Sequence, residues 1–139
     1  MLIGEYAHSI DIKGRVNFPA KMRDHLGERF ILTKGLDNCL FVYAGDEWAR
    51  LEDKIKALPM SKARTLQRFL FSGAVEVELD KQGRIVIPQN LRDYAGLAKD
   101  VMIIGASTRA EIWDKDRWQE SCNELTPQMV EQAMDDLGF

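Results

Sequence analysis

The sequence predicts an α+β fold, mainly β, in which one module occurs twice. The first observation is an internal repeat: residues 11–15 (Asp-Ile-Lys-Gly-Arg) resemble residues 80–84 (Asp-Lys-Gln-Gly-Arg) at an offset of 69 (80 − 11). The second is that, in both copies, short runs rich in β-branched residues alternate with short helical segments that follow a proline. The third is composition, because 139 residues, 45% hydrophobic and 29% charged, suffice for two small modules that share a core.

The repeat covers most of the chain. Its matches fall on Gly, Pro, Asp, Arg and Trp, residue types that end elements or fix turns, so we take it as a real duplication. They are Gly4 with Gly73, Pro19 with Pro88, Arg23 with Arg92, Asp24 with Asp93 and Gly27 with Gly96, and then, at an offset of 70, Gly35 with Gly105, Tyr43 with Trp113, Asp46 with Asp116 and Trp48 with Trp118. We predict a first module over residues 1–58, a linker helix over 59–70, a second module over 71–125 and a helical tail over 126–139.

Each module is expected to open with two strands, at residues 5–10 and 15–18 in the first copy and at residues 74–79 and 84–87 in the second. Between the strands, the side chain of Asp11 or Asp80 can accept hydrogen bonds from the backbone that turns after it. Gly14 or Gly83 then supplies a position with positive φ. A β-hairpin with a type I turn and a glycine bulge fits this pattern.

A short helix follows in each copy, at residues 20–26 and 89–95. Each helix begins after a proline, whose missing N–H is tolerated in a first turn, and each ends at a glycine suited to a left-handed cap, Gly27 or Gly96. A second pair of strands comes next, at residues 29–33 and 39–43 in the first copy and at residues 101–104 and 110–113 in the second.

A further helix closes each module, with Asp46 and Asp116 as its expected N-caps. We also expect helices at residues 61–71 and after Pro127, where the tail can dock on the body or on a neighbouring subunit. Apolar residues recur at helical spacing in the first closing helix and in the tail: Trp48, Leu51, Ile55 and Leu58, then Val130, Ala133, Met134 and Leu137.

The chain shows no enzyme signature. No G-x-S-x-G, P-loop, Rossmann glycine fingerprint or H-E-x-x-H occurs. Asp11 and Asp80 resemble a carboxylate pair for acid–base work, but their place before a tight turn favours a structural duty. We therefore expect no catalytic residue, no cofactor and no small-molecule substrate.

Two cysteines and two histidines are too scattered for metal-ligand spacing, so we expect no bound metal and no disulfide; they are His8, His25, Cys39 and Cys122. No stretch approaches the roughly 20 consecutive apolar residues of a membrane helix. The first residues lack the basic and apolar regions of a signal peptide, which favours a cytoplasmic protein.

Lysine and arginine side chains accompany both turns. The candidate DNA-binding residues are Lys13 and Arg15 at the first turn, Lys81 and Arg84 at the second, and Lys21 and Arg23 on the first short helix. Such side chains can reach phosphates, and arginine can bind guanine through two hydrogen bonds. Two other interpretations stay open: the cations are solvated surface charges, or each turn arginine pairs with the aspartate four residues before it. The net charge of −3 means that DNA binding needs the positive charge gathered on one face.

The doubled motif resembles that of the MraZ family of bacterial transcriptional regulators. It stands in residues 9–20 (Ser-Ile-Asp-Ile-Lys-Gly-Arg-Val-Asn-Phe-Pro-Ala) and in residues 78–88 (Glu-Leu-Asp-Lys-Gln-Gly-Arg-Ile-Val-Ile-Pro). Residues 35–40 and 71–74 are also similar to the family, whereas residues 124–139 fit its pattern least. The likeness therefore covers nearly the whole chain.

This resemblance implies two AbrB-like (SpoVT-AbrB) swapped-hairpin repeats, similar to a double-split β-barrel, that form an intramolecular pseudo-dimer. It implies an autorepressor of the division and cell-wall gene cluster, found in the cytoplasm and associated with the nucleoid. The expected partners are double-stranded DNA, as short G-rich direct repeats upstream of the operon, and copies of the chain in a ring of about eight or more subunits.

By position, the resemblance assigns Asp11, Lys13 and Arg15 to the first motif and Asp80 and Arg84 to the second. The second copy has Gln82 where the first has Lys13, so unequal DNA contacts by the two copies are expected. The alternative function is an AbrB-like antitoxin or another protein-interaction module, and a third is a small enzyme with an unrecognised site.

Overall fold

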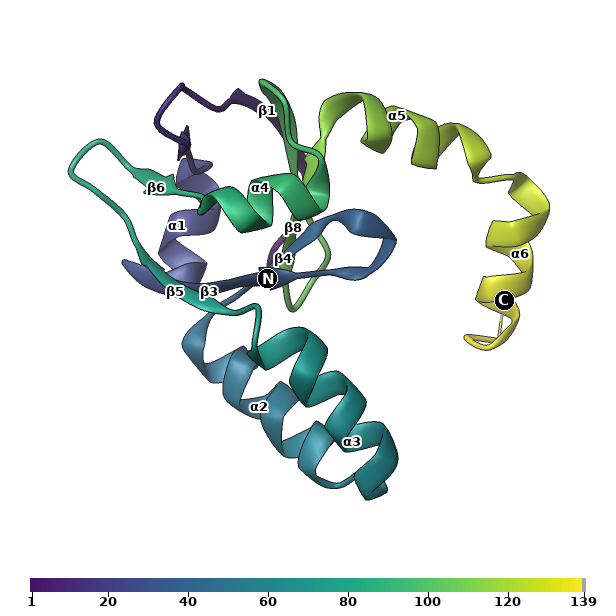
Figure 1. The fold of residues 1–139 in the computed structure, drawn as a ribbon. Helices are drawn as coiled ribbons and strands as arrows, with labels where there is room; N and C mark the ends of the chain where they lie inside the picture. The colour runs from purple at the N-terminus through teal and green to yellow at the C-terminus, as the bar shows by residue number, and fades with distance from the viewer. Residues whose placement is uncertain (139) are drawn as a thin grey trace.

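Strands from the two modules share one antiparallel sheet. The computed structural model describes residues 1–138; six strands lie in the order β1-β7-β8-β4-β3-β5, and β2 and β6 form a separate two-stranded ribbon (Figure 1). The strands are β1 (Glu5–Ser9), β2 (Arg15–Asn17), β3 (Arg29–Lys34), β4 (Leu40–Tyr43), β5 (Val75–Glu78), β6 (Arg84–Val86), β7 (Asp100–Gly105) and β8 (Ala110–Asp114). The predicted α+β class is confirmed.

The order of the strands has two-fold symmetry. The repeat relates β1 to β5, β2 to β6, β3 to β7 and β4 to β8. Exchanging the members of each pair gives the same order of strands read from the opposite edge of the sheet. In the middle of the sheet Phe41 lies opposite Glu111, and in the ribbon Val16 lies opposite Ile85. Both are pairs of repeat-equivalent positions (41 + 70 and 16 + 69), so a pseudo-two-fold axis passes near both. The implied intramolecular pseudo-dimer is confirmed.

The predicted hairpins are wrong in their strand partners. β1 pairs with β7 of the other module instead of β2, and β5 correspondingly pairs with β3. β2 pairs with its own counterpart, β6. Each Asp-x-x-Gly-Arg turn therefore connects the sheet to the ribbon, and the strands on its two sides have different partners. Local turn chemistry sets the direction of the chain, but long-range burial decides which strand lies beside it.

The helices are α1 (Ala20–Leu26), α2 (Gly45–Lys56), α3 (Met60–Leu66), α4 (Gln89–Ala95), α5 (Lys115–Glu124) and α6 (Pro127–Asp135), with a 3-10 turn η1 (Leu36–Asn38) and a π-helical turn η2 (Gln67–Phe71) that continues α3. Pro19 and Pro88 directly precede α1 and α4, as predicted. Gly96 ends α4 in the predicted left-handed conformation, with φ 60° and ψ 33°. Gly27 also caps its helix, since its N–H donates to the Arg23 carbonyl at 2.8 Å, but with φ 83° and ψ −173° it does not adopt the predicted left-handed conformation.

The predicted N-caps of the closing helices are wrong by two residues. α2 follows Ala44, and α5 follows Asp114, whose carboxylate accepts a hydrogen bond from the Arg117 backbone. Asp46 and Asp116 lie inside the first turns, where their negative charges still favour the helix dipole. Both helices start earlier because the preceding strands lead straight into them.

Both faces of the sheet are covered. On one face, the ribbon, α1 and α4 bury the main core, in which Phe18, Leu32 and Ile103 have no exposed surface. On the other face, Trp48 of α2 and Trp118 of α5 pack against a second cluster that contains Trp113. The Trp113 and Trp118 rings lie 5.3 Å apart, centre to centre. The tryptophans therefore pack within the protein.

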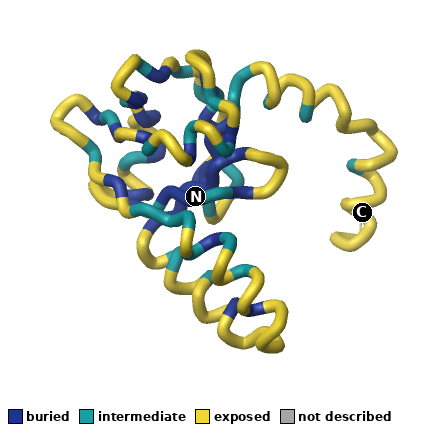
Figure 2. The backbone as a smooth tube through the Cα atoms, in the orientation of Figure 1, coloured by how far each residue is buried: buried dark blue, intermediate teal, exposed yellow. Residues whose placement is uncertain are grey.

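Two helical arms leave this body (Figure 1). α2 and α3 pack together through Ile55 and Ala63, whereas α5 and α6 extend away on the other side. Figure 2 shows α6 exposed along nearly all its length. The apolar side chains Met129 and Met134 of α6, and Leu137 just after it, lie at the surface.

Candidate nucleic-acid interface

A single aspartate holds the first turn. Oδ1 of Asp11 accepts the backbone N–H groups of Lys13 and Arg15, both at 2.9 Å, and Oδ2 accepts Nε of Arg15 at 2.7 Å. The Gly14 N–H donates to the Asp11 carbonyl at 2.9 Å, and Gly14 has φ 83°. This is the predicted type I turn with a glycine bulge. The hydrogen bonds, first that from the Arg15 backbone, lower the pKa of Asp11, so its carboxylate stays charged at neutral pH.

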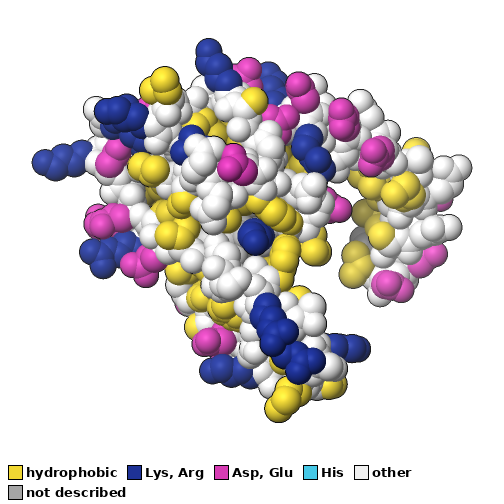
Figure 3. All heavy atoms as spheres, viewed as in Figure 1, with side chains coloured by type: hydrophobic (Ala, Val, Ile, Leu, Met, Phe, Trp, Pro, Cys, Tyr) yellow, Lys and Arg dark blue, Asp and Glu magenta, His cyan; other side chains and the backbone are white. Residues whose placement is uncertain are grey.

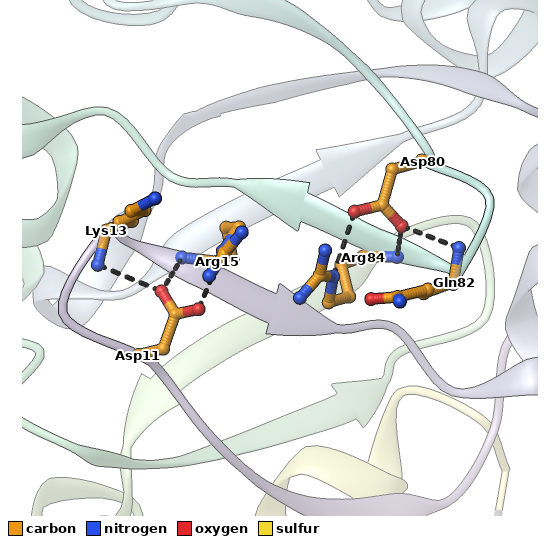
Figure 4. A network of polar contacts seen from close by, with 6 residues as sticks. All are labelled: Asp11, Lys13, Arg15, Asp80, Gln82 and Arg84. Atoms are coloured by element: carbon orange, nitrogen blue, oxygen red, sulfur yellow. Dashed lines mark hydrogen bonds and ion pairs between the residues drawn. The ribbon is translucent and has the colours of Figure 1, made fainter.

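The second turn repeats this arrangement (Figure 4). Oδ1 of Asp80 accepts the backbone N–H groups of Gln82 and Arg84, both at 2.9 Å, and Oδ2 accepts Nε of Arg84 at 2.9 Å. Gly83 has φ 76° and donates its N–H to the Asp80 carbonyl at 3.0 Å. The pKa of Asp80 is lowered by the same cause, first the hydrogen bond from the Arg84 backbone. The pairing of each arginine with its aspartate is therefore real and occurs twice.

This pairing leaves the cations accessible. Lys13 and Lys81 are exposed, and the side chains of Arg15 and Arg84 keep 33% and 26% of their surface exposed. Within residues 1–138, the hydrogen bonds of both arginine side chains use only Nε. The two terminal nitrogens of each guanidinium therefore have donors available for another acceptor.

The ribbon of β2 and β6 holds the two turns at its opposite ends (Figure 4). Its inner face buries Val16 and Ile85, and because side chains alternate along a strand, its outer face carries both arginines. The Phe18 N–H bonds to the Gly83 carbonyl, and the Ile87 N–H bonds to the Gly14 carbonyl, both at 2.9 Å. Gly14 and Gly83 are thus four residue steps apart, about 13 Å. That length is close to the width of the DNA major groove, about 12 Å, which admits a two-stranded ribbon.

Charge is separated along the molecule. The two turns carry four cations and two carboxylates, a net of +2 (4 − 2). Residues 124–139 carry four acidic residues and no lysine or arginine, so the rest of the chain has a net charge of +1 (−3 + 4). Figure 3 shows acidic side chains along the α5–α6 arm, and lysine and arginine side chains near the β5–β6 turn and over α3. The acidic total is therefore compatible with a locally cationic surface.

The two candidates on α1 lie in different surroundings. Lys21 is exposed, whereas Arg23 is half-buried and its Nε donates to the Phe18 carbonyl at 2.7 Å. Its repeat equivalent Arg92, on α4, donates Nε to the Ile87 carbonyl at 2.9 Å. Lys13, Arg15, Lys81 and Arg84 therefore share the ribbon and its turns, and Arg23 packs behind them.

A buried ionic group on the opposite face of the sheet was not anticipated. Oε2 of Glu111 accepts Nε of Arg109 at 2.9 Å, and its Oε1 accepts the indole N–H of Trp113 at 3.0 Å. The Arg109 guanidinium lies 4.2 Å from the centre of the Phe41 ring. A signal existed in the repeat, which aligns the charged Glu111 with the apolar Phe41. The group is fully paired, so it stabilises the centre of the sheet without offering a free acceptor.

Across residues 1–138, no three His, Cys, Asp or Glu side chains gather as metal ligands would. None of the helices described is long and apolar enough to cross a membrane.

A protein-family model described as "MraZ protein, putative antitoxin-like" matches the chain twice, over residues 1–69 and 70–137. Proteins named "Transcriptional regulator MraZ" are similar along the chain. The protein from Caldicellulosiruptor bescii is 58% identical and that from Acetivibrio thermocellus 56%, each with 100% of both chains covered. That from Caldanaerobacter subterraneus subsp. tengcongensis is 61% identical over 86% of this chain and 85% of its own.

Among solved structures, PHS018 from Pyrococcus horikoshii is 15% identical, with a TM-score of 0.31 over 81% of this chain and 88% of that one. This likeness is too weak to bear on the fold. The sequence relatives and the family model, which cover both copies of the doubled turn, place the chain in the MraZ family.

Proposed function

We propose that this chain is a sequence-specific DNA-binding transcriptional regulator whose contact surface is the outer face of the β2–β6 ribbon. The proposal rests on the two symmetric turns at the ends of one ribbon, whose separation is close to the width of the DNA major groove. The turns present four cations: Lys13, Arg15, Lys81 and Arg84. The names of the relatives agree with this proposal. Arg23 is half-buried and supports this surface from behind, whereas the exposed Lys21 extends the cationic surface along α1.

The finer parts of the proposal follow the family resemblance. The regulator represses its own division and cell-wall operon by binding short G-rich direct repeats, in the cytoplasm and at the nucleoid. It carries out no catalysis and uses no small-molecule substrate. The modules are residues 1–58 and 71–125, joined by a linker at 59–70 and followed by a tail at 126–139.

Self-association raises the overall DNA affinity, because the contacts that a single ribbon makes are weak. A ring of about eight or more subunits engaging consecutive repeats adds roughly 10²- to 10⁴-fold through effective concentration. Two exposed surfaces are suited to contacts between copies. α6 presents Met129 and Met134, with Leu137 just after it, beside acidic residues, and a groove along α3 is lined by Leu58, Lys62 and Leu66.

The test is a gel shift of the full chain with the duplex that lies upstream of its own gene, and with a scrambled duplex. Arg15→Ala and Arg84→Ala are each expected to weaken binding by about 5- to 150-fold, because a lost arginine–guanine contact costs about 1–3 kcal/mol. Arg64→Ala, an exposed cation on α3, is the matched control and leaves binding unchanged. Size-exclusion chromatography of each variant checks the oligomer. Undiminished binding by the double variant Arg15→Ala/Arg84→Ala contradicts the proposed surface.

An antitoxin-like or other protein-interaction role is the second candidate. The family description and the exposed apolar side of α6 favour it. Replacing Met129, Met134 and Leu137 with Ser separates the two roles. If α6 serves self-association, the triple variant elutes as a smaller species and loses the avidity for repeats. If α6 serves a different protein, the oligomer and the DNA affinity both persist.

A further inference from the structure

We propose that each DNA-contacting turn is a composite of both modules, because an arginine of one module positions the turn of the other. Arg92 supports the first turn through Gly14, and Arg23 supports the second turn through Gly83. Both act as positioning residues and neither contacts DNA. This inference rests on the proposed DNA-binding function.

The first contact is between α4 and the first turn. A Cβ atom on Gly14 would lie 2.9 Å from Cζ of Arg92, so the guanidinium occupies the space that a side chain would need. The Arg92 Nε donates to the Ile87 carbonyl, and the Ile87 N–H donates to the Gly14 carbonyl. Arg92 thus packs on the turn glycine and also fixes the strand end to which that glycine is bonded.

The second contact repeats the first through the pseudo-two-fold axis. A Cβ atom on Gly83 would overlap the guanidinium of Arg23. The Arg23 Nε donates to the Phe18 carbonyl, and the Phe18 N–H donates to the Gly83 carbonyl. The guanidinium, the glycine and the bridging residue correspond in both contacts at the repeat offset of 69 (92 − 23, 83 − 14 and 87 − 18).

The consequence is a crossed dependence. A glycine at the fourth turn position serves two purposes: it adopts positive φ, and it leaves room for the arginine of the other module. Because the planar guanidinium fills this space and donates a hydrogen bond from a fixed direction, lysine does not replace it. Loss of Arg92 is therefore expected to loosen the turn that carries Arg15, and loss of Arg23 the turn that carries Arg84.

Hydrogen exchange on the full chain without DNA tests the positioning directly. Arg92→Ala is expected to speed exchange about fivefold or more at the Gly14 and Arg15 amides, as for a lost hydrogen bond, and to leave the Gly83 and Arg84 amides unchanged. Arg23→Ala gives the reverse pattern. Arg92→Lys behaves like Arg92→Ala. Equal effects on both turns, or an effect only on the turn of the same module, would overturn the inference.

Binding to the upstream duplex supplies the second readout. In double-variant cycles, Arg92→Ala is non-additive with Arg15→Ala and additive with Arg84→Ala, because only the first pair shares a turn. The slope of log K against log salt stays unchanged in Arg92→Ala, whereas loss of a direct phosphate contact would lower it by about 0.9. A lowered slope in Arg92→Ala that Arg92→Lys restores would show that residue 92 contacts DNA, and would contradict the positioning role. Absence of binding by the unaltered protein would overturn the proposed function, and the exchange pattern would still decide the crossed positioning.

Discussion

The two turns of the molecule are nearly identical inside and different at their tips. In both, one aspartate accepts two backbone N–H groups and the Nε of an arginine, at distances from 2.7 to 2.9 Å. At the tips, the first turn has Ile12 and Lys13 where the second has Lys81 and Gln82. Each turn therefore keeps one lysine, but its position moves by one residue.

This difference shows which residues of each turn are constrained by its backbone conformation and which are free to vary. The internal residues satisfy backbone groups, and a change there leaves donors without partners. The tips face solvent, and Ile12 is 97% exposed. An apolar side chain so fully exposed stabilises little within the chain, and its methyl groups suit contact with a thymine methyl group. We call the aspartate, glycine and arginine of each turn its frame, and the two residues between the aspartate and the glycine its tip. Substitutions in the frame should change stability, and substitutions at the tip should change DNA recognition.

The glycines of the frame carry the largest expected effect on stability. Gly14→Ala and Gly83→Ala each force positive φ on a residue with a Cβ, at a cost of about 1–3 kcal/mol in the free energy of unfolding. In addition, the Cβ of Gly14→Ala would lie 2.9 Å from Cζ of Arg92 and 3.0 Å from the Ile87 carbonyl, and the Cβ of Gly83→Ala would overlap the Arg23 guanidinium, so each variant also disturbs the contact with the other module. Urea unfolding measures both.

The control for this comparison is Gly45→Ala, since Gly45 has ordinary φ and open space around it. It is expected to leave stability unchanged or raise it slightly. A Gly14→Ala variant as stable as Gly45→Ala would show that the two turns are not held as described.

Exchanging the tips is expected to change recognition by a smaller amount. The double variant Ile12→Lys/Lys13→Gln gives the first turn the tip of the second without changing net charge. We expect a change of about fivefold in affinity for the upstream duplex, of the size of one lost apolar base contact, with an unchanged salt slope. Fluorescence anisotropy across a salt series measures both quantities. The reciprocal variant Lys81→Ile/Gln82→Lys is the control; a salt slope that changes in only one of them would show that the tip lysines are not equivalent.

The smallest expected effect concerns His8, which has no titratable counterpart because Val77 occupies the equivalent position. Burial, and secondarily the charge of Arg23, lowers the pKa of His8 below 6.5. The unfolded chain therefore binds the proton more readily, so the contribution of His8 is complete above pH 6.5 and is lost as the pH falls through its folded pKa. His8→Val should flatten the fall of the melting temperature between about pH 7 and pH 5. An unchanged pH profile in His8→Val would place the titrating group elsewhere.

Much of the local structure could be predicted from the sequence. The Asp-x-x-Gly-Arg turns, the helices after Pro19 and Pro88 and the helix continued by η2 depend on residues a few positions apart, so their side chains and backbone preferences already specify them. The duplication also follows from the sequence alone. The repeated motif also places the cationic side chains Lys13, Arg15, Lys81 and Arg84 on the turns.

Strand partners were decided only by the tertiary structure. A turn that ends β1 and begins β2 favours a hairpin locally, but burial of Val16 and Ile85 against each other's module places β2 beside β6 and β1 beside β7. Such pairings join residues far apart in the chain, and no local preference encodes them. The same reason hides the contact of Arg92 with Gly14. The sequence by itself determined two turns of the same kind. The packing of one module across the other determined that an arginine of the opposite module completes each turn.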